Sequence, residues 1–294
     1  MPNKIGTESE INKTLKSNNL HAKKKFGQNF LKNQKILEAI RDISECDKDT
    51  LVIEIGPGLG GLTELLCEKA GFVLAYEVDS DLIDILHNNL SRFNNYEIIN
   101  KDILTVDVNK DIDKYNYNKI YLVANLPYYI TTPIITKLLS EVERIERYVV
   151  LLQKEVAHRL AGKPSTKDYG AITLAIEYRG SAKVMLEVNR NAFIPAPNVD
   201  SSVLRIDIYP NKKYFPKDEK LFFELIRMSF NQRRKTLINN LSEKYNKEFI
   251  VKMLNDNLYK QSIRAEELSI DDFIKLSDYI KEMEWFYDKR ICLC

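Results

Sequence analysis

The stretch "YLVANLPYYITTP", from Tyr121 to Pro133, carries an apolar run directly into a polar turn. Ile120 to Ala124 reads as a buried strand, and Asn125, Leu126, Pro127 and Tyr128 follow it at once. The Asn amide oxygen and a backbone carbonyl, held by the fixed φ of proline, offer two hydrogen-bond acceptors beside a flat phenol ring. Two acceptors beside an aromatic face predict a site that binds a planar base through hydrogen bonds from its exocyclic amine.

Asn125 is the informative residue of this turn. A strand that ends at a proline with an aromatic contact would explain Pro127 and Tyr128, but it leaves the amide unexplained. Because a neutral Asn is a feeble base, we expect it to act by positioning and electrostatics rather than by removing a proton.

The flanking sequence predicts an α/β fold. Short apolar runs such as "LVIEI", "FVLAYEVD" and "RYVVLLQ" alternate with helical patterns from residue 51, which indicates a parallel sheet covered on both faces. "AKVMLEVN" and "SSVLRIDIY" are joined by a loop too short for a crossover helix, so we expect them to pair antiparallel. Helical patterns follow the linker "YPNKKYFPKDEK", which places a domain boundary near residue 210.

A glycine-rich turn follows the first of these strands. In "EIGPGLGGLT", the glycines at 56, 58, 60 and 61 satisfy both G-x-G-x-x-G and G-x-G-x-G. The first spacing is a dinucleotide fingerprint and the second is typical of S-adenosylmethionine sites. The spacing alone leaves both open, together with a plain tight turn.

Two acids follow the next strands. Glu77 closes the second strand, where a carboxylate can accept ribose hydroxyls, and Asp102 follows the third, where it can accept from an adenine amino group. Each alone would pass as a solvated residue or a helix cap. Together with the glycine turn, at successive strand ends of one sheet, they predict a nucleoside pocket.

Composition and charge are those of a globular protein. Hydrophobic residues make up 44%, charged residues 29%, and the net charge is +2. Residues 1–35 nevertheless hold eight lysines and two glutamates, and "RMSFNQRRK" holds four positive charges without an acid. Two such clusters suggest contact with a polyanion, although solvated helix faces and a Lys-rich terminus explain the charge equally well.

Cysteine placement and the amino terminus bear on location. The cysteines at 46, 67, 292 and 294 form no CxxC pair, which predicts reduced thiols in a cytoplasmic protein without a metal site. No apolar run approaches the roughly 18 residues of a membrane span. Residues 1–22 lack the apolar region of a signal peptide and are expected to be a flexible polar leader.

The motifs in their order resemble one known family. "KKKFGQNFL", "EIGPGLGGLT", "YEVD", "NLPYYITTPII", "LLQKEVAHRL", "FIPAPNVDSSV" and "FNQRRKTL" are similar to those of the ribosomal small-subunit RNA adenine N6,N6-dimethyltransferases, from Lys23 through the carboxyl-terminal helices. The resemblance implies a class I S-adenosylmethionine-dependent methyltransferase fold, Rossmann-like with a mostly parallel seven-stranded sheet, over residues 23–210. It also implies a smaller all-α RNA-binding domain over residues 211–294.

The resemblance further implies an activity and a partner. The enzyme would dimethylate two adjacent adenosines in the 3′-terminal hairpin loop of 16S rRNA, within the 30S subunit, as a monomer that takes part in ribosome biogenesis. Asn29, Leu31, Gly56, Gly58, Glu77, Asp102 and Asn125 would bind S-adenosylmethionine.

The remaining roles concern the RNA. Phe193 would stack on a flipped adenine opposite Tyr128, although a core aromatic is the alternative that the residue alone favours. Arg233, Arg234 and Lys235 would contact rRNA phosphates.

Three other functions remain to be weighed. The 23S rRNA adenine methyltransferases of macrolide resistance share the catalytic core, but typically carry Ile where Leu126 stands and lack the "FIPAPNVDS" form. A nicotinamide oxidoreductase would use Gly56–Gly61 and Glu77, but leaves the Asn125 turn without a purpose. A non-catalytic assembly factor that binds rRNA is the third, and this role is compatible with catalysis.

Overall fold

The computed structural model describes residues 5–291, so Cys292 and Cys294 lie outside it. The chain folds as two compact units. The first contains the described residues up to Ala157 together with Ala182–Ile208, and the second contains His158–Ser181 and the described residues from Tyr209 onward. Residues 158–181, which the sequence analysis placed in the catalytic domain, thus group with the carboxyl-terminal helices. No helix within residues 5–291 is both long and apolar enough to cross a membrane.

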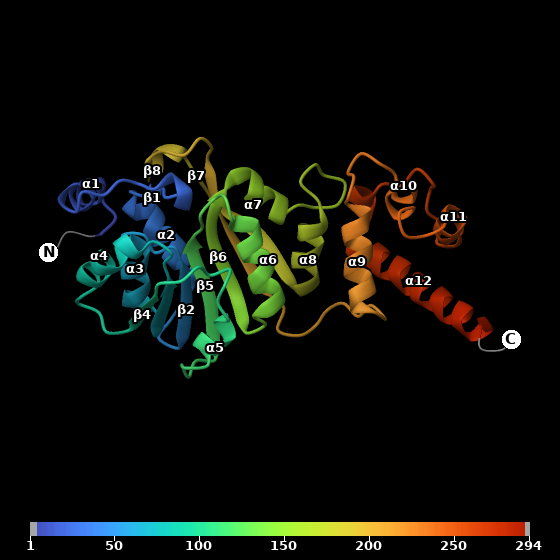
Figure 1. The fold of residues 1–294 in the computed structure, drawn as a ribbon, viewed down its shortest axis with the longest axis horizontal. Coiled ribbons are helices and arrows are strands. Elements are labelled where there is room, and N and C mark those ends of the chain that lie inside the picture. Colours follow the sequence, from blue (N-terminus) through green and yellow to red (C-terminus); the bar gives the residue numbers. More distant parts are fainter. Residues whose placement is uncertain (1–4, 292–294) are drawn as a thin grey trace. The chain divides into compact units, whose positions relative to one another are not determined.

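A seven-stranded sheet forms the centre of the first unit, with the strand order β4-β3-β2-β5-β6-β9-β7 (Figure 1). Strands β2 to β6 pair in parallel, and β9 runs antiparallel to β6, as the fold class predicted. The strands are β2 (Thr50–Ile55), β3 (Phe72–Tyr76), β4 (Tyr96–Ile99), β5 (Lys119–Asn125), β6 (Ile145–Gln153), β7 (Gly180–Val188) and β9 (Ser201–Ile208).

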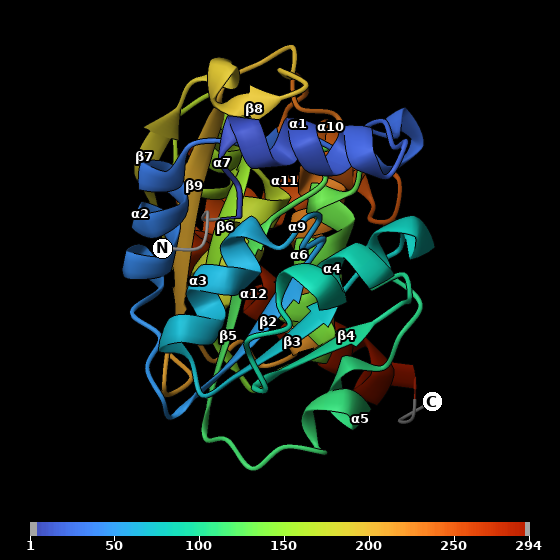
Figure 2. The same ribbon diagram turned by 90° about the vertical axis from the view of Figure 1, so that its left-hand side faces the viewer.

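Helices cover both faces of this sheet. In Figure 2, α2 and α3 lie on one side and α6 on the other. Leu37 of α2 and Leu65 of α3 share a buried cluster with Val52, Val123 and Val149. These valines lie on the neighbouring strands β2, β5 and β6, and their side chains point to the same face of the sheet. The helices of this unit are α1 (Glu8–Ser17), η1 (Lys24–Phe26), α2 (Gln34–Ser44), α3 (Gly61–Lys69), η2 (Ser80–Leu82), α4 (Ile83–Asn89), α5 (Val108–Ile112), α6 (Thr131–Glu141), α7 (Lys154–Leu160, which crosses into the second unit) and η3 (Arg190–Ala192).

The second unit is helical and has a core of its own. Its buried side chains include Tyr169, Phe222, Leu254 and Phe273, so each helix contributes an apolar face to one interior. The helices are α8 (Ala171–Arg179), α9 (Glu219–Ser229), α10 (Leu237–Leu241), α11 (Lys247–Asp256), η4 (Ala265–Glu267) and α12 (Ile270–Ile291).

The amino-terminal segment is ordered where a flexible leader was expected. Residues 8–17 form helix α1, which begins at an N-cap, Thr7, whose side chain accepts from the Glu10 amide at 3.3 Å. Ile11 of this helix is 2% exposed. Within the segment that was expected to be a flexible leader, residues 1–22, residues 8–17 are therefore helical and place one apolar side chain in the interior of the first unit.

The order of the strands determines where a ligand can bind. The chain runs outward from β2 to β3 and β4, then returns to add β5 on the other side of β2. In open α/β sheets this reversal leaves a crevice at the carboxyl ends of the strands. Gly56, Glu77 and Asn125 stand at or directly after the carboxyl ends of β2, β3 and β5.

Candidate active site

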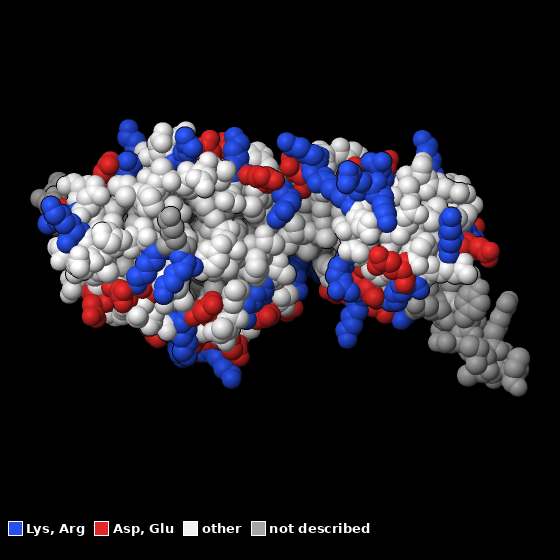
Figure 3. Space-filling view, turned by 45° about the horizontal axis from the view of Figure 1, so that its top comes forward, with Lys and Arg blue, Asp and Glu red and all other residues white. Residues whose placement is uncertain are grey.

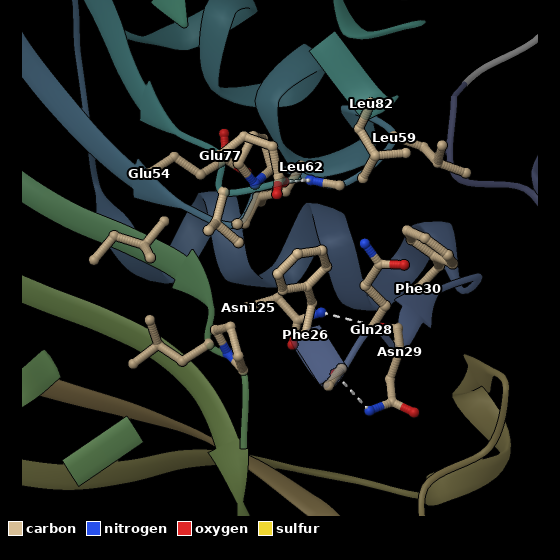
Figure 4. Close-up of a pocket in the computed structure, with 18 of the residues that line it drawn as sticks. Phe26, Gln28, Asn29, Phe30, Glu54, Leu59, Leu62, Glu77, Leu82 and Asn125 are labelled. Atoms are coloured by element: carbon tan, nitrogen blue, oxygen red, sulfur yellow. Dashed lines mark hydrogen bonds between the residues drawn. The ribbon is translucent and has the colours of Figure 1, made fainter. Parts of the chain in front are cut away.

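A pocket opens at this reversal point and is lined by the predicted cofactor residues and by the turn that follows β5 (Figure 4). In Figure 4, Glu54 and Glu77 lie on the side of the sheet, and Phe26 and Gln28 lie opposite them on the segment before β1 (Phe30–Leu31). The Asn29 side chain points away from the two acids and donates to the Gly27 carbonyl at 3.0 Å. Leu59, Leu62 and Leu82 add apolar wall. The predicted residues that line the pocket are Asn29, Leu31, Gly56, Gly58, Glu77, Asp102, Asn125, Leu126, Pro127 and Tyr128.

The glycine turn needs its glycines for two separate reasons. Gly56 has a φ of 68° and Gly58 a φ of 60°, a region that other residues adopt only with strain. A Cβ on Gly58 would also come within 3.2 Å of the Phe30 ring. The turn therefore brings bare backbone to the pocket, and its second half begins helix α3.

Glu77 ties the glycine turn to the end of β3. Its carboxylate accepts from the Gly58 amide at 3.2 Å and from the Asp79 amide at 2.8 Å, and the side chain is only 4% exposed. Burial raises the pKa of this carboxyl to about 7, although the two amides favour the ionised form.

Glu54 is a pocket residue that the sequence analysis did not single out. It is the next-to-last residue of β2 and is 1% exposed, and its Oε2 atom has no hydrogen-bond partner among the described residues. Burial raises the pKa of this carboxyl to about 8. An acid inside the apolar run "LVIEI" was a visible signal, since a carboxyl group is rarely buried in a strand without a purpose.

The segment before β1 is held to the acids that follow β3. Asp79 is 3% exposed and accepts from the Lys23 ammonium at 2.6 Å and from the Gln28 amide at 2.7 Å. Burial disfavours the ionised form of Asp79, but these two bonds outweigh it and hold the pKa of the carboxyl below its usual range. The Asn125 side-chain amide in turn donates to the Asn29 carbonyl at 3.2 Å.

The turn after β5 is fixed by its own backbone. The Leu126 amide donates to the Leu151 carbonyl of β6 at 3.0 Å. The Pro127 carbonyl already accepts from the Ile130 amide at 3.3 Å and from the Thr131 hydroxyl at 3.0 Å. These bonds engage Pro127, so the Leu126 carbonyl is the backbone acceptor that fits the predicted role beside Asn125.

Tyr128 is braced by a residue that the sequence analysis did not assign. Its hydroxyl lies 2.5 Å from the hydroxyl of Ser201, which is fully buried at the start of β9. Burial raises the pKa of the Tyr128 phenol, so the ring is neutral near pH 7. No spacing in the sequence connects these two residues, because the contact arises only when β5 and β9 flank β6 in the sheet.

Phe193 does not line the pocket, although its strand partner Leu31 does. It pairs with Leu31 across the two-stranded sheet of β1 and β8 (Phe193–Ile194) and is 2% exposed within the core of the first unit. The sequence left two roles open for Phe193, stacking on a base or packing in the core. Its position agrees with packing in the core, because the β1–β8 pairing places the residue in the interior of the first unit.

The predicted RNA-binding residues lie in the second unit, in the loop between α9 and α10. Arg233, Arg234 and Lys235 are all exposed there. Arg233 also donates to the Glu266 carboxylate and to the Thr166 carbonyl, each at 3.2 Å, and these bonds fix its position.

Known proteins resemble this chain over most of its length. The family model described as ribosomal RNA adenine dimethylase matches residues 19–282. "Ribosomal RNA small subunit methyltransferase A" of Streptococcus pyogenes serotype M3 is 46% identical over 268 residues, which cover 89% of this chain and 92% of the relative. The protein of the same name from Streptococcus agalactiae is 45% identical over 269 residues, covering 89% and 93%.

Solved structures agree with the sequence matches. A dimethyladenosine transferase from Plasmodium falciparum has a TM-score of 0.70 at 25% identity and covers 84% of this chain and 95% of its own. The 23S rRNA methyltransferase ErmE has a TM-score of 0.66 at 25% identity, covering 85% and 98%. The family match, the curated relatives and the residues gathered in the pocket agree, and the chain belongs to the ribosomal RNA adenine dimethylase family.

Proposed function

We propose that this protein transfers methyl groups from S-adenosylmethionine to N6 of two adjacent adenosines in the 3′-terminal hairpin loop of 16S rRNA, within the 30S particle. Both adenosines become N6,N6-dimethyladenosine during small-subunit biogenesis. This role would place the enzyme in the cytoplasm. The enzyme would act as a monomer. The observation that carries the proposal is Asn125 at the rim of a pocket that also holds Glu54, Glu77 and the glycine turn.

The pocket fits S-adenosylmethionine chemically. The orphaned Oε2 of Glu54 is an acceptor without a partner among the described residues, and a cationic ligand would satisfy it. Glu77 and Asp102 line the same pocket and suit ribose hydroxyls and an adenine amino group, while the bare backbone at Gly56 permits close approach of the methionine portion. S-adenosylmethionine supplies, when bound, an electrophilic methyl group on a good leaving group.

The residues after β5 prepare the adenine for attack. N6 of adenine is a poor nucleophile because its lone pair is delocalised into the ring. Before the first transfer, the Asn125 amide oxygen and the Leu126 carbonyl would accept hydrogen bonds from the two N–H groups of N6, which favours a tetrahedral nitrogen and returns electron density to it. Each transfer replaces one N–H bond by an N–CH3 bond and releases that proton to solvent, so the second transfer would use the single remaining N–H group. The Tyr128 ring offers a face for the extruded base, and Ser201 fixes the orientation of that ring.

The basic loop of the second unit is suited to RNA phosphates. Arg233, Arg234 and Lys235 are exposed, and phosphate contacts position a nucleic acid without reading its sequence. On the face drawn in Figure 3, Lys and Arg side chains lie among Asp and Glu rather than forming one continuous basic surface. We therefore propose local phosphate contacts by this loop.

The activity is tested on ribosomal subunits. Purified protein, labelled S-adenosylmethionine and unmethylated 30S subunits should give two adjacent dimethyladenosines in 16S rRNA by mass spectrometry. Asn125→Ala should slow transfer by about 100-fold or more while 30S binding persists, because the variant loses an acceptor used in the transition state. Asn118→Ala, an exposed residue just before the other end of β5, should transfer normally.

Two outcomes contradict this proposal. Methyl groups incorporated into 50S subunits rather than 30S subunits, in a parallel assay with each, would favour the 23S enzyme. Methyl transfer at the wild-type rate by Asn125→Ala would show that the Asn125 amide has no part in the mechanism.

The Tyr128–Ser201 contact is tested by removing either hydroxyl. Tyr128→Phe and Ser201→Ala each keep the ring but lose the bond, so each should lower kcat/KM for the RNA by several-fold to about tenfold. The double variant should match the single ones, since both remove the same interaction. Ser202→Ala is the control, because the Ser202 hydroxyl bonds Glu187 instead. Losses that multiply in the double variant would show that the two residues act separately.

The pH dependence of stability tests the buried carboxyl of Glu54. Its pKa rises from 4.5 in the unfolded chain to about 8 on folding, so the folded protein holds more protons between these values. Ligand-free stability should therefore fall as pH rises from about 5 to 8, and Glu77 acts in the same direction. Glu54→Gln should flatten the fall in Tm, whereas Glu155→Gln, at an exposed position, should not. Identical profiles for Glu54→Gln and wild type would refute the assignment.

A further inference from the structure

The cofactor pocket has a wall that lies outside the family match. Gly6 and Ile11 line the same pocket as Glu77 and Asn125, yet both precede residue 19, where the family match begins. We propose that residues 5–17, named here the amino-terminal strap, retain S-adenosylmethionine by closing this side of the pocket. The inference rests on the proposed function, because it requires that S-adenosylmethionine binds in this pocket.

The first anchor of the strap is a turn bound to the start of helix α3. The Ile5 amide donates to the Glu64 carboxylate at 3.0 Å, and the Gln34 side chain donates to the Ile5 carbonyl at 2.5 Å. Glu64 is 4% exposed, so this bond is shielded from water. The next residue, Gly6, has a φ of 90° and lies against Gly61, the first residue of α3.

The second anchor is the apolar side of helix α1. Ile11 is 2% exposed and is buried in one cluster with Phe30, Leu59 and Leu86. Phe30 in turn packs against Gly58 of the glycine turn. The strap therefore contacts the glycine turn through Leu59, and it contacts β1 through Phe30, the residue that follows the predicted cofactor residue Asn29.

The strap borders a second cavity as well as the cofactor pocket. This cavity is lined by Thr14 of α1 and by Asn88 and Asn89 of α4. Gly6, Ile11 and Leu59 line both this cavity and the cofactor pocket, so the strap forms part of the partition between two hollows. A segment held by a few contacts beside a cavity opens at lower free energy than a core element. Such a segment can release a ligand without unfolding the sheet.

The test measures binding of S-adenosylhomocysteine to full-length protein. Ile11→Ser removes the apolar anchor, and Gly6→Ala would place a Cβ 2.9 Å from a Leu37 methyl group at a φ of 90°. Both variants should raise the dissociation rate constant and the Kd by about tenfold. Lys13→Ser is the control, since Lys13 lies on α1 with its side chain 72% exposed, and it should leave both constants unchanged.

Hydrogen exchange separates a contact with the cofactor from a purely structural role. If the strap closes on the ligand, S-adenosylhomocysteine should protect the amides of α1 in the wild type, because the coupling is reciprocal. Unchanged dissociation in both variants, although exchange shows that α1 has been released, would overturn the inference and leave the methyltransferase proposal intact. Failure of the wild-type protein to bind S-adenosylhomocysteine would instead overturn the proposed function.

Discussion

The active-site pocket depends on the buried acids that follow β3. Glu77 accepts from the backbone of the glycine turn, and Asp79 accepts from Lys23 and Gln28 of the segment before β1. The backbone carbonyl of Asn29 in that segment accepts a hydrogen bond from the Asn125 side-chain amide. Three stretches that are distant in sequence are thus joined by hydrogen bonds, and the carboxylate acceptors Glu77 and Asp79 are shielded from water, which strengthens their bonds. Loss of this connection would leave the strand ends in place but would free the segment that carries Gln28 and Asn29.

The carboxyls of the pocket carry an energetic cost that a ligand can offset. Glu54 and Glu77 are almost fully buried, and burial raises the pKa of each toward neutrality. Such groups destabilise the ligand-free protein as they ionise, and a cation or a set of hydroxyl donors compensates that cost. The same arrangement explains why the chemistry at Asn125 can rely on placement, since the binding energy comes from elsewhere in the pocket.

Local patterns were sufficient to predict the sheet and most of the pocket. Alternating strands and helices gave the parallel sheet, and because parallel strands end at one edge, Gly56, Glu77 and Asn125 had to meet there. Long-range packing decided what the patterns missed. A helix of 10 residues such as α1 is marginal in isolation, so its existence depends on the burial of Ile11. Likewise, only the pairing of β1 with β8 makes Phe193 a core residue, and only the sheet order brings Ser201 to Tyr128.

The central claim is that one pocket brings a methyl donor and an adenine amine together at Asn125. A crystal structure of the protein with bound S-adenosylhomocysteine tests it most directly. We expect the ligand against the Gly56 turn, its ribose hydroxyls within hydrogen-bond distance of Glu77, and the Asn125 amide oxygen turned toward the ligand sulfur. A ligand bound elsewhere on the chain, or an Asn125 side chain directed into the interior, would contradict the account.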